Sequence, residues 1–243
     1  MNPVCKDAGS FPERTPYRIA MHIDPAHPEY LHLRLLRRDV KRVAIHACGR
    51  LLDIGCGSQP YRNVLARNVP RYVGFDLPPD RWSGRTNRAD VWGRAERLPF
   101  AEGSFDTVVS FQVLEHLREP WTVVAEAARV LRPGGCLILT TVQHYHVHGE
   151  PNDFFRFTRH GLASLSERAG LSVIECSEQG GGWVTVSETV LRFFSGHYWR
   201  TVRRPAWSRA ICRAGNALFG WLDRRFPYPG NPCNLTLVAQ KAV

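Results

Sequence analysis

The chain has 243 residues, of which 44% are hydrophobic and 22% are charged. This composition is ordinary for a globular protein, and the length suits one domain with a sizeable core plus some elaboration. No run of about 18 apolar residues is present, so no transmembrane helix is expected. The N-terminus lacks the apolar segment of a signal peptide.

Cysteine usage and charge further restrict the class of protein. The seven cysteines are scattered, odd in number and never spaced as C-x-x-C. A disulfide framework and a structural zinc site are therefore not expected, and we expect reduced thiols in a cytoplasmic protein. The net charge is +10, and residues 189–230 alone contain eight arginines and one acid. The positive charge is thus largely regional.

The hydrophobic pattern predicts an α/β protein. Residues 1–27 show little periodicity, and we interpret them as an arm. A helix is expected from residue 28 to about 47, since its leucines and valines recur on one face. Strands are expected at 50–54, 71–76, 105–111, 136–142, 171–177 and 234–240, with a weaker one at 88–91. Helices are expected at 59–68, 121–131 and 159–169. This alternation predicts a doubly wound, Rossmann-like sheet, mostly parallel, with ligands at the carboxyl ends of its strands.

A glycine turn follows the first of these strands. Gly55-Cys56-Gly57-Ser58 comes after the apolar run 51–54, and Asp76 ends the next strand 19 residues after Gly57. Glycines allow a ligand to approach the backbone closely, and the start of the following helix favours an anionic group. A carboxylate at the position of Asp76 can accept both hydroxyls of a ribose. The pattern predicts a site for a nucleotide-like ligand.

Two details favour one ligand over another. A dinucleotide fingerprint has a third glycine where this chain has Pro60, which disfavours a nicotinamide oxidoreductase. Asp53 precedes the first glycine by two residues, where it can reach the ammonium of an amino-acid-like ligand. Asp53 and the turn together resemble motif I of the class I S-adenosylmethionine-dependent methyltransferases.

Further motifs follow in the order typical of that family. They include 98–100 (Leu-Pro-Phe), 104–106 (Ser-Phe-Asp), 114–116 (Leu-Glu-His) and 133–135 (Pro-Gly-Gly). The run over residues 50–142 resembles the ubiquinone/menaquinone-type small-molecule methyltransferases. The resemblance implies a seven-stranded sheet with helices on both faces and an antiparallel last strand. It also implies S-adenosyl-L-methionine as cofactor and S-adenosyl-L-homocysteine as product.

The resemblance assigns a set of cofactor-binding residues. Asp53 would contact the methionyl ammonium, Asp76 the ribose, and Leu77 the adenine. The full set is Asp53, Gly55, Cys56, Gly57, Asp76, Leu77, Ala95, Glu96 and Gln112. Relatives often have Asp-Ala in the loop before Leu-Pro-Phe, whereas this chain has Arg94-Ala95. Because arginine cannot accept a hydrogen bond from adenine, Glu96, Asp90 or a backbone carbonyl would have to substitute.

The acceptor side is predicted from two segments. His116 faces the pocket in this family, and a histidine near neutrality can act as a general base or simply pack. The loop after the fifth strand contains histidines at alternate positions and then Asp153 and Arg156. We expect His116 and His148 as catalytic residues and His144, Asp153 and Arg156 as acceptor-binding residues. The alternative is that Asp153 and Arg156 form a pair that only shapes the loop. No metal site is expected.

The domain organisation follows from these patterns. We expect an arm and a capping helix over 1–49, the cofactor-binding core over 50–179, a helical insertion over 180–233 and the last strand over 234–243. The helix before the core can instead pack on the sheet edge. In the insertion, one apolar face contains Val186, Val190, Phe193, Phe194 and His197, and a second contains Trp207, Ile211, Ala214, Leu218 and Leu222. These faces either pack on each other and on the domain or contact a membrane or lipid-like acceptor through 189–230.

The leading hypothesis is methyl transfer to a small or amphiphilic acceptor by direct in-line displacement. A nucleic-acid methyltransferase is less well supported, because Ser110-Phe111-Gln112-Val113 lacks the N/D-P-P-Y type of motif used for exocyclic amines. A third hypothesis is a peripheral-membrane or regulatory protein that binds the cofactor without turnover. The sequence indicates neither the acceptor, nor the atom methylated, nor the oligomeric state.

Overall fold

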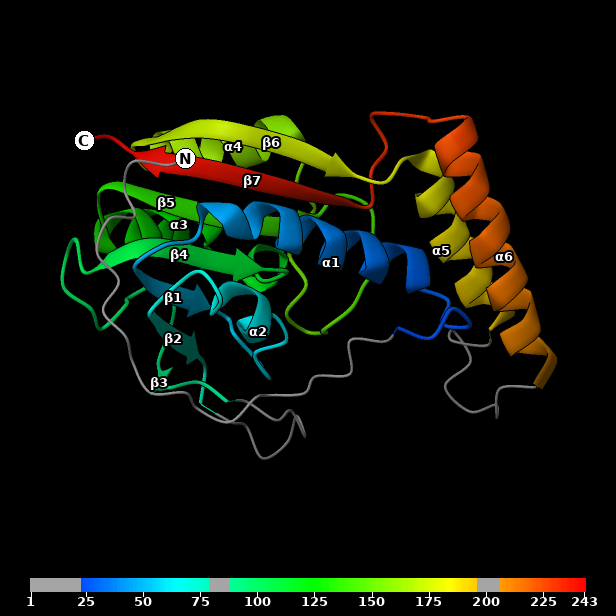
Figure 1. Cartoon of the computed structure of the whole chain (residues 1–243), viewed down its shortest axis with the longest axis horizontal. Coiled ribbons are helices and arrows are strands. Elements are labelled where there is room, and N and C mark those ends of the chain that lie inside the picture. Colours follow the sequence, from blue (N-terminus) through cyan, green and yellow to red (C-terminus); the bar gives the residue numbers. More distant parts are fainter. Residues whose placement is uncertain (1–22, 79–87, 196–205) are drawn as a thin grey trace.

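The computed structural model describes residues 23–78, 88–195 and 206–243. Within them a seven-stranded sheet has the order β3-β2-β1-β4-β5-β7-β6 (Figure 1). Its strands are β1 (Arg50–Ile54), β2 (Arg71–Asp76), β3 (Val91–Trp92), β4 (Phe105–Phe111), β5 (Leu131–Val142), β6 (Leu171–Gln179) and β7 (Asn234–Lys241). Only β7 runs antiparallel to its neighbours, β5 and β6. The predicted fold class is confirmed.

The chain order reverses at β1. The pairs β1–β2 and β1–β4 are both parallel, with Asp53 opposite Gly74 on one side and Val109 on the other. One connection from β1 therefore leads toward β2 and a later one brings the chain back to β4. In such sheets the crevice outside the carboxyl ends of the strands at the reversal is the usual ligand site.

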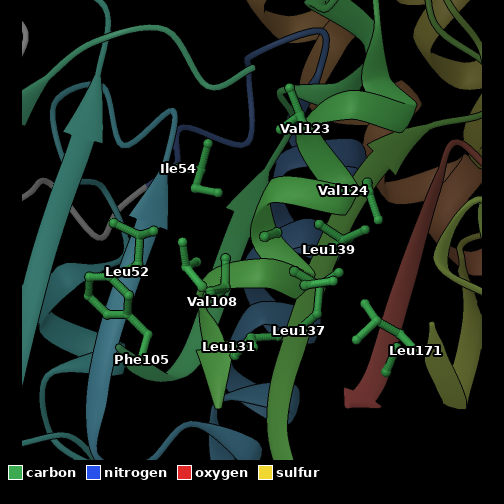
Figure 2. Close-up of a cluster of buried hydrophobic side chains, with 14 of the residues drawn as sticks. Leu52, Ile54, Phe105, Val108, Val123, Val124, Leu131, Leu137, Leu139 and Leu171 are labelled. Atoms are coloured by element: carbon green, nitrogen blue, oxygen red, sulfur yellow. The ribbon is translucent and has the colours of Figure 1, made fainter. Parts of the chain in front are cut away.

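Helices cover both faces of the sheet. One buried cluster joins the strands to α3 (Pro120–Val130) and α4 (Arg159–Arg168), and Figure 2 shows Val123 and Val124 among its strand side chains. The other joins the strands to α1 (Tyr30–Val43) and to α2 (Arg62–Leu65). A 3-10 turn, η1 (Ala44–His46), continues α1, and a second, η2 (Leu114–His116), follows β4. The two clusters form the apolar layers that hold the strand ends in place.

Several expected bounds were wrong. The helix expected at 59–68 is reduced to α2, because Gln59 has a left-handed φ of 60° and cannot belong to a helix. The fifth strand begins at Leu131 rather than 136, and the weak strand at 88–91 is Val91–Trp92. The expected N-terminal arm lies mostly outside the described residues. The helix that follows it, α1, packs across a face of the sheet rather than only at its edge (Figure 1).

The insertion forms two helices, α5 (Gly182–Phe194) and α6 (Ala206–Arg225), packed on each other. Figure 1 shows this pair beyond the carboxyl ends of β1 and β4. For α6, the alternative in which its apolar face packs on the domain does not hold. Its buried face consists of small or polar residues such as Ser208, Cys212 and Asn216. Exposed instead are Trp207 (56%), Ile211 (39%), Leu218 (53%) and Trp221 (50%).

On α5, too, apolar residues of the expected face are exposed. Val186, Phe193 and Phe194 are between 44% and 59% exposed. His197 lies outside the described residues. The side of α5 toward the body contains Ser187, Glu188 and Arg192 instead, and all three are buried. Within the described part of the chain, no helix is long and apolar enough to cross a membrane.

Candidate active site

The two glycines of the turn have different roles. Gly55 has a φ of 73°, and a Cβ on it would lie 2.4 Å from a methyl carbon of Val113. It is required for the close packing of the turn against the segment after β4. Gly57 has a φ of 50°, and among the described residues, its chain neighbours aside, no atom lies within 4 Å of the position of a Cβ. The backbone is therefore open to a ligand at Gly57.

The Asp76 carboxylate is fixed beside this open position. One of its oxygens accepts a hydrogen bond from the Gly57 amide at 2.7 Å, and the other accepts one from the Leu77 amide at 2.7 Å. A carboxylate oxygen has two lone pairs, so each retains one for a ribose hydroxyl. Leu77 itself is 55% exposed, as expected for a residue that contacts a planar ring. Both residues fit the role that the sequence predicts for them.

Asp53 lies at the end of β1 and is only 3% exposed. The Tyr72 hydroxyl donates a hydrogen bond to its carboxylate. Burial raises the pKa of Asp53 to about 7, and the hydrogen bond from Tyr72 only partly offsets this effect. Within the described residues, the groups that act on this carboxyl include no cation. The ammonium of an amino-acid-like ligand would supply one.

The remaining cofactor residues lie around this edge. The Cys56 side chain is buried with its sulfur 3.9 Å from the Gly57 carbonyl, so only its main chain can face a ligand. Ala95 packs on the core, and Glu96 accepts a hydrogen bond from Arg94 at 3.1 Å. Asp90 instead accepts one from the Gly74 amide in β2. Each of the two acids that could replace the adenine contact therefore has one hydrogen-bond donor within the described residues.

Gln112 has an uncommon backbone conformation. Its φ is 56°, which is rare for a residue other than glycine and is often found at functional sites. The backbone N–H of Gln112 donates a hydrogen bond to the Thr140 carbonyl at 2.9 Å, which fixes this conformation at the end of β4. Gln112 therefore directs the chain from β4 toward η2, where Glu115 and His116 lie.

The structure brings His116 and His148 together, although 31 residues separate them in the sequence. Their ring centroids are 4.6 Å apart. Burial, and then the nearby His116, lower the pKa of His148 to about 4, so His148 is neutral near pH 7. Glu115 is fully buried, which raises its pKa, and it accepts a hydrogen bond from Thr141 at 2.9 Å. One ligand atom from each of Glu115, His116 and His148 lies within 4.8 Å of the others.

Asp153 and Arg156 form a brace within the loop. Arg156 donates to both oxygens of Asp153, at 2.6 and 2.8 Å, and to the carbonyls of Tyr145 and His146. This pairing holds the pKa of Asp153 well below its usual range. Asp153 also accepts a hydrogen bond from the His148 amide at 2.8 Å. The arrangement matches the alternative in which the pair shapes the loop. The amide of His144 bonds the Cys233 carbonyl at 3.2 Å, and its side chain is half-buried.

Sequence reasoning missed a polar cluster that links the loop after β5 (residues 143–158, here called the acceptor loop for its predicted role) to α5. Buried Glu188 lies 3.2 Å from His146 and 3.4 Å from His32 of α1. Although burial opposes it, the hydrogen bond from His146 and the nearby His32 lower the pKa of Glu188. Arg192 pairs with Glu29 one turn further along α5. The only signal in the sequence is the position of Glu188 on the polar side of an amphipathic helix.

A doubly wound sheet with an open glycine turn, a ribose-type carboxylate and a buried acid defines a binding domain for a nucleoside linked to an amino acid. Known proteins agree with this class. Residues 52–139 match the family model described as a methyltransferase domain. The 27-O-demethylrifamycin SV methyltransferase of Amycolatopsis mediterranei is 37% identical over 117 residues, which is 44% of this chain and 43% of that protein.

Two further similarities extend the comparison. The ubiquinone biosynthesis O-methyltransferase of Xanthomonas oryzae pv. oryzae is 34% identical over 105 residues, 40% of this chain and 44% of that protein. The crystal structure of the [4+2]-cyclase SpnF has a TM-score of 0.56 at 22% identity, covering 86% of this chain and 81% of that one. Residues 52–139 therefore form a methyltransferase domain of the type found in S-adenosylmethionine-dependent enzymes. The chain spans less than half the length of the curated relatives it matches.

Substituting Gly57 should weaken cofactor binding, while its effect on the free energy of unfolding should equal that of a glycine elsewhere with the same kind of backbone. Gly57 and Gly170 both have positive φ, 50° and 77°, and neither has an atom near the position of a Cβ. Gly57→Ala and Gly170→Ala should each cost about 1 kcal/mol of unfolding free energy. Only Gly57→Ala should weaken S-adenosylmethionine binding, at least about tenfold. Urea unfolding and calorimetry measure the two quantities. Equal cofactor affinity in the two variants would contradict the assignment of the turn.

Cofactor binding should release a proton from Asp53. Its pKa of about 7 exceeds the ordinary value near 3.9, so the free protein holds this proton below pH 7. A bound ammonium favours the carboxylate, so affinity should rise between about pH 5 and pH 7 and then level off. Calorimetry in two buffers of different ionisation enthalpy measures the proton release.

Two variants serve as controls for this proton release. Asp53→Asn should bind weakly at every pH without proton release. Tyr72→Phe should move the release to higher pH, because the Tyr72 hydroxyl lowers the pKa of Asp53. A pH-independent affinity in the unaltered protein would refute the role of Asp53.

Proposed function

We propose that the protein is a methyltransferase that transfers the S-adenosylmethionine methyl group to a small or amphiphilic acceptor. The observation that supports this most directly is that the open glycine turn lies close to the Glu115–His116–His148 group. The two are held near each other because Gly55 packs against Val113, which directly precedes this group in the chain. The turn belongs to the methyl donor, and the histidines belong to the side where an acceptor would lie.

The cofactor supplies an activated methyl group on a sulfonium, so the protein mainly aligns the acceptor and helps to remove its proton. In this proposal Asp53 holds the ammonium, Asp76 the ribose, and Leu77, Ala95 and Glu96 the adenine. The main chain of the glycine turn and Gln112 line the rest of the site. Alignment of two reactants can contribute effective molarities of about 10⁵ M or more.

On the acceptor side we propose that His116 receives the proton from the acceptor. Its Nδ1 lies 2.6 Å from the Asn152 carbonyl oxygen, which can only accept a hydrogen bond. Nδ1 therefore holds the proton and Nε2 is free to take another. His148 lies beside it and stays neutral near pH 7. His144, Asp153 and Arg156 would border the acceptor, with Asp153 and Arg156 also fixing the loop.

The relatives support a small acceptor. Those that are named for their substrates act on a rifamycin precursor, a ubiquinone precursor or a malonylated carrier protein. A nucleic-acid substrate is not favoured. The similarity to a [4+2]-cyclase shows that this fold also supports chemistry other than methyl transfer, so the test requires a readout of the methyl group itself.

The function is tested by measuring S-adenosylhomocysteine formation with a panel of phenols, hydroxy acids and amphiphilic quinols. His116→Asn should lower kcat by about 10² or more and leave cofactor affinity unchanged, because a general base contributes of this order. The control is His160→Asn, an exposed histidine on α4. Cofactor binding without turnover on every acceptor would instead support the regulatory hypothesis.

We further propose that α5 and α6 contact an anionic membrane surface. The exposed residues Trp207, Ile211, Leu218 and Trp221 recur at intervals of four, seven and three, so they form one stripe along α6. Arg224 and Arg225 are exposed at the end of this helix, and Asp223 is the only acid among residues 206–225. A second copy of the chain would bring these like charges together, whereas anionic headgroups complement them.

Membrane contact should depend on both the stripe and the lipid charge. The full chain should co-sediment with vesicles of phosphatidylcholine and phosphatidylserine, less so in high salt, and little with phosphatidylcholine alone. Leu218→Ser combined with Trp221→Ser should abolish binding. The control pair is Ile45→Ser with Ile174→Ser, two residues elsewhere that are at least as exposed as Leu218 and Trp221. Equal binding of both pairs, or a concentration-dependent dimer without vesicle binding, would contradict the proposal.

A further inference from the structure

Glu115, His116 and His148 form a compact group of side chains that can each bind a metal ion. It combines two imidazoles and one carboxylate from two segments, η2 and the loop after β5. In the described part of the chain, one carboxylate oxygen of Glu115, Oε1, is buried without a hydrogen-bond partner. A buried carboxylate oxygen without a partner costs free energy unless something pairs with it.

Both histidines are oriented by their Nδ1 atoms. His116 Nδ1 lies 2.6 Å from the Asn152 carbonyl, and His148 Nδ1 lies 3.1 Å from the His146 carbonyl. Since a carbonyl only accepts, each Nδ1 is a donor and each Nε2 retains a lone pair. Backbone carbonyls that fix the tautomer in this way are the usual second shell of metal-binding histidines.

The loop is also shaped around this group. Gly149 has a φ of 69°, and a Cβ on it would lie 2.9 Å from the His116 ring. The Glu115 carbonyl accepts hydrogen bonds from the amides of Phe154 and Phe155, which holds the end of the loop against η2. The Thr141 hydroxyl fixes the second oxygen of Glu115. The three side chains are therefore held in position by contacts outside the group itself.

The geometry points to a binding site for one divalent first-row transition-metal ion, held by Glu115, His116 and His148. Two imidazoles with one carboxylate suit Mn²⁺, Fe²⁺, Co²⁺ or Zn²⁺, whereas Mg²⁺ and Ca²⁺ prefer oxygen ligands alone. Metal–nitrogen bonds are about 2.0–2.1 Å long, so rotation of the side chains must draw the ligand atoms somewhat closer than 4.8 Å. Three protein ligands leave coordination positions open, as in catalytic sites.

A role in catalysis follows if the proposed function holds. An acceptor hydroxyl bound at an open position would lose its proton to water more easily, because the metal lowers its pKa. The oxygen would then attack the methyl carbon, the carbon–sulfur bond would break, and its electron pair would remain on the sulfur of the product. In the metal-loaded protein His116 would thus be a ligand, and the metal would replace it as the group that promotes loss of the proton.

The test uses the full chain freed of metal by chelation and titrated with Co²⁺, which gives visible absorption bands when it is bound by nitrogen and oxygen ligands. We expect one ion per chain. Loss of a residue that only supports a metal ligand typically weakens binding by about 10–100-fold. Glu115→Gln and His148→Asn should each weaken binding by more than this, because each removes a ligand. His160→Asn should bind as the unaltered protein does. S-adenosylmethionine affinity, which depends on other residues, verifies that each variant is folded.

Two results would overturn the site. One is the absence of Co²⁺, Mn²⁺ and Zn²⁺ binding at millimolar concentration, and the other is binding by Glu115→Gln and His148→Asn that is as tight as in the unaltered protein. Metal binding without methyl transfer on any acceptor would refute the proposed function and leave the site intact. If transfer occurs, chelation should lower kcat and Co²⁺ or Mn²⁺ should restore it. Full activity after chelation would refute the catalytic role.

Discussion

The contact between Gly55 and Val113 is the constraint on which the site depends. A Cβ at Gly55 would lie 2.4 Å from the Val113 side chain, so this position requires glycine both for its φ of 73° and for space. The contact places the end of β1 directly against the segment that follows β4. As a result, the open backbone at Gly57 and the side chains of η2 lie at one edge of the sheet. Donor and acceptor chemistry can therefore meet there without any long loop between them.

A second set of contacts attaches the acceptor loop to this edge. The backbone of Glu115 holds Phe154 and Phe155, Asp153 and Arg156 brace the loop internally, and His146 reaches Glu188 on α5. The loop is thus bound on one side to the cofactor edge and on the other to the helical insertion. A surface that positions the exposed α6 stripe would also position the helix that contacts this loop.

Much of the fold could be predicted from the sequence because its signals are local. Five of the seven strands begin at the expected residue, since each is a short apolar run closed by polar residues. The predicted cofactor-binding residues follow from short local motifs, from Asp53 in the glycine turn to Gln112 after β4. The exceptions are conformational: the left-handed φ values of Gln59 and Gln112 shorten a helix and redirect a strand end. Neither residue type signals such a backbone.

The acceptor side was harder to predict because it depends on contacts between distant segments. The alternating histidines of residues 144–148 indicated no complete metal site, yet His148 meets Glu115 and His116 across 32 residues of sequence. The sequence left the burial of the apolar face of α6 open for a related reason. Hydrophobic periodicity identifies an apolar stripe but not whether the protein covers it, and here the small residues Ser208, Cys212 and Gly215 form the packed face.

The central claim is that the donor methyl group lies between the glycine turn and the Glu115–His116–His148 group. A crystal structure with S-adenosylhomocysteine tests it most directly. We expect the ribose hydroxyls on Asp76, the ammonium beside Asp53, and the sulfur near the ring of His116. A sulfur more than about 10 Å from both His116 and His148, well beyond the distance at which an acceptor could bridge them, would contradict the account.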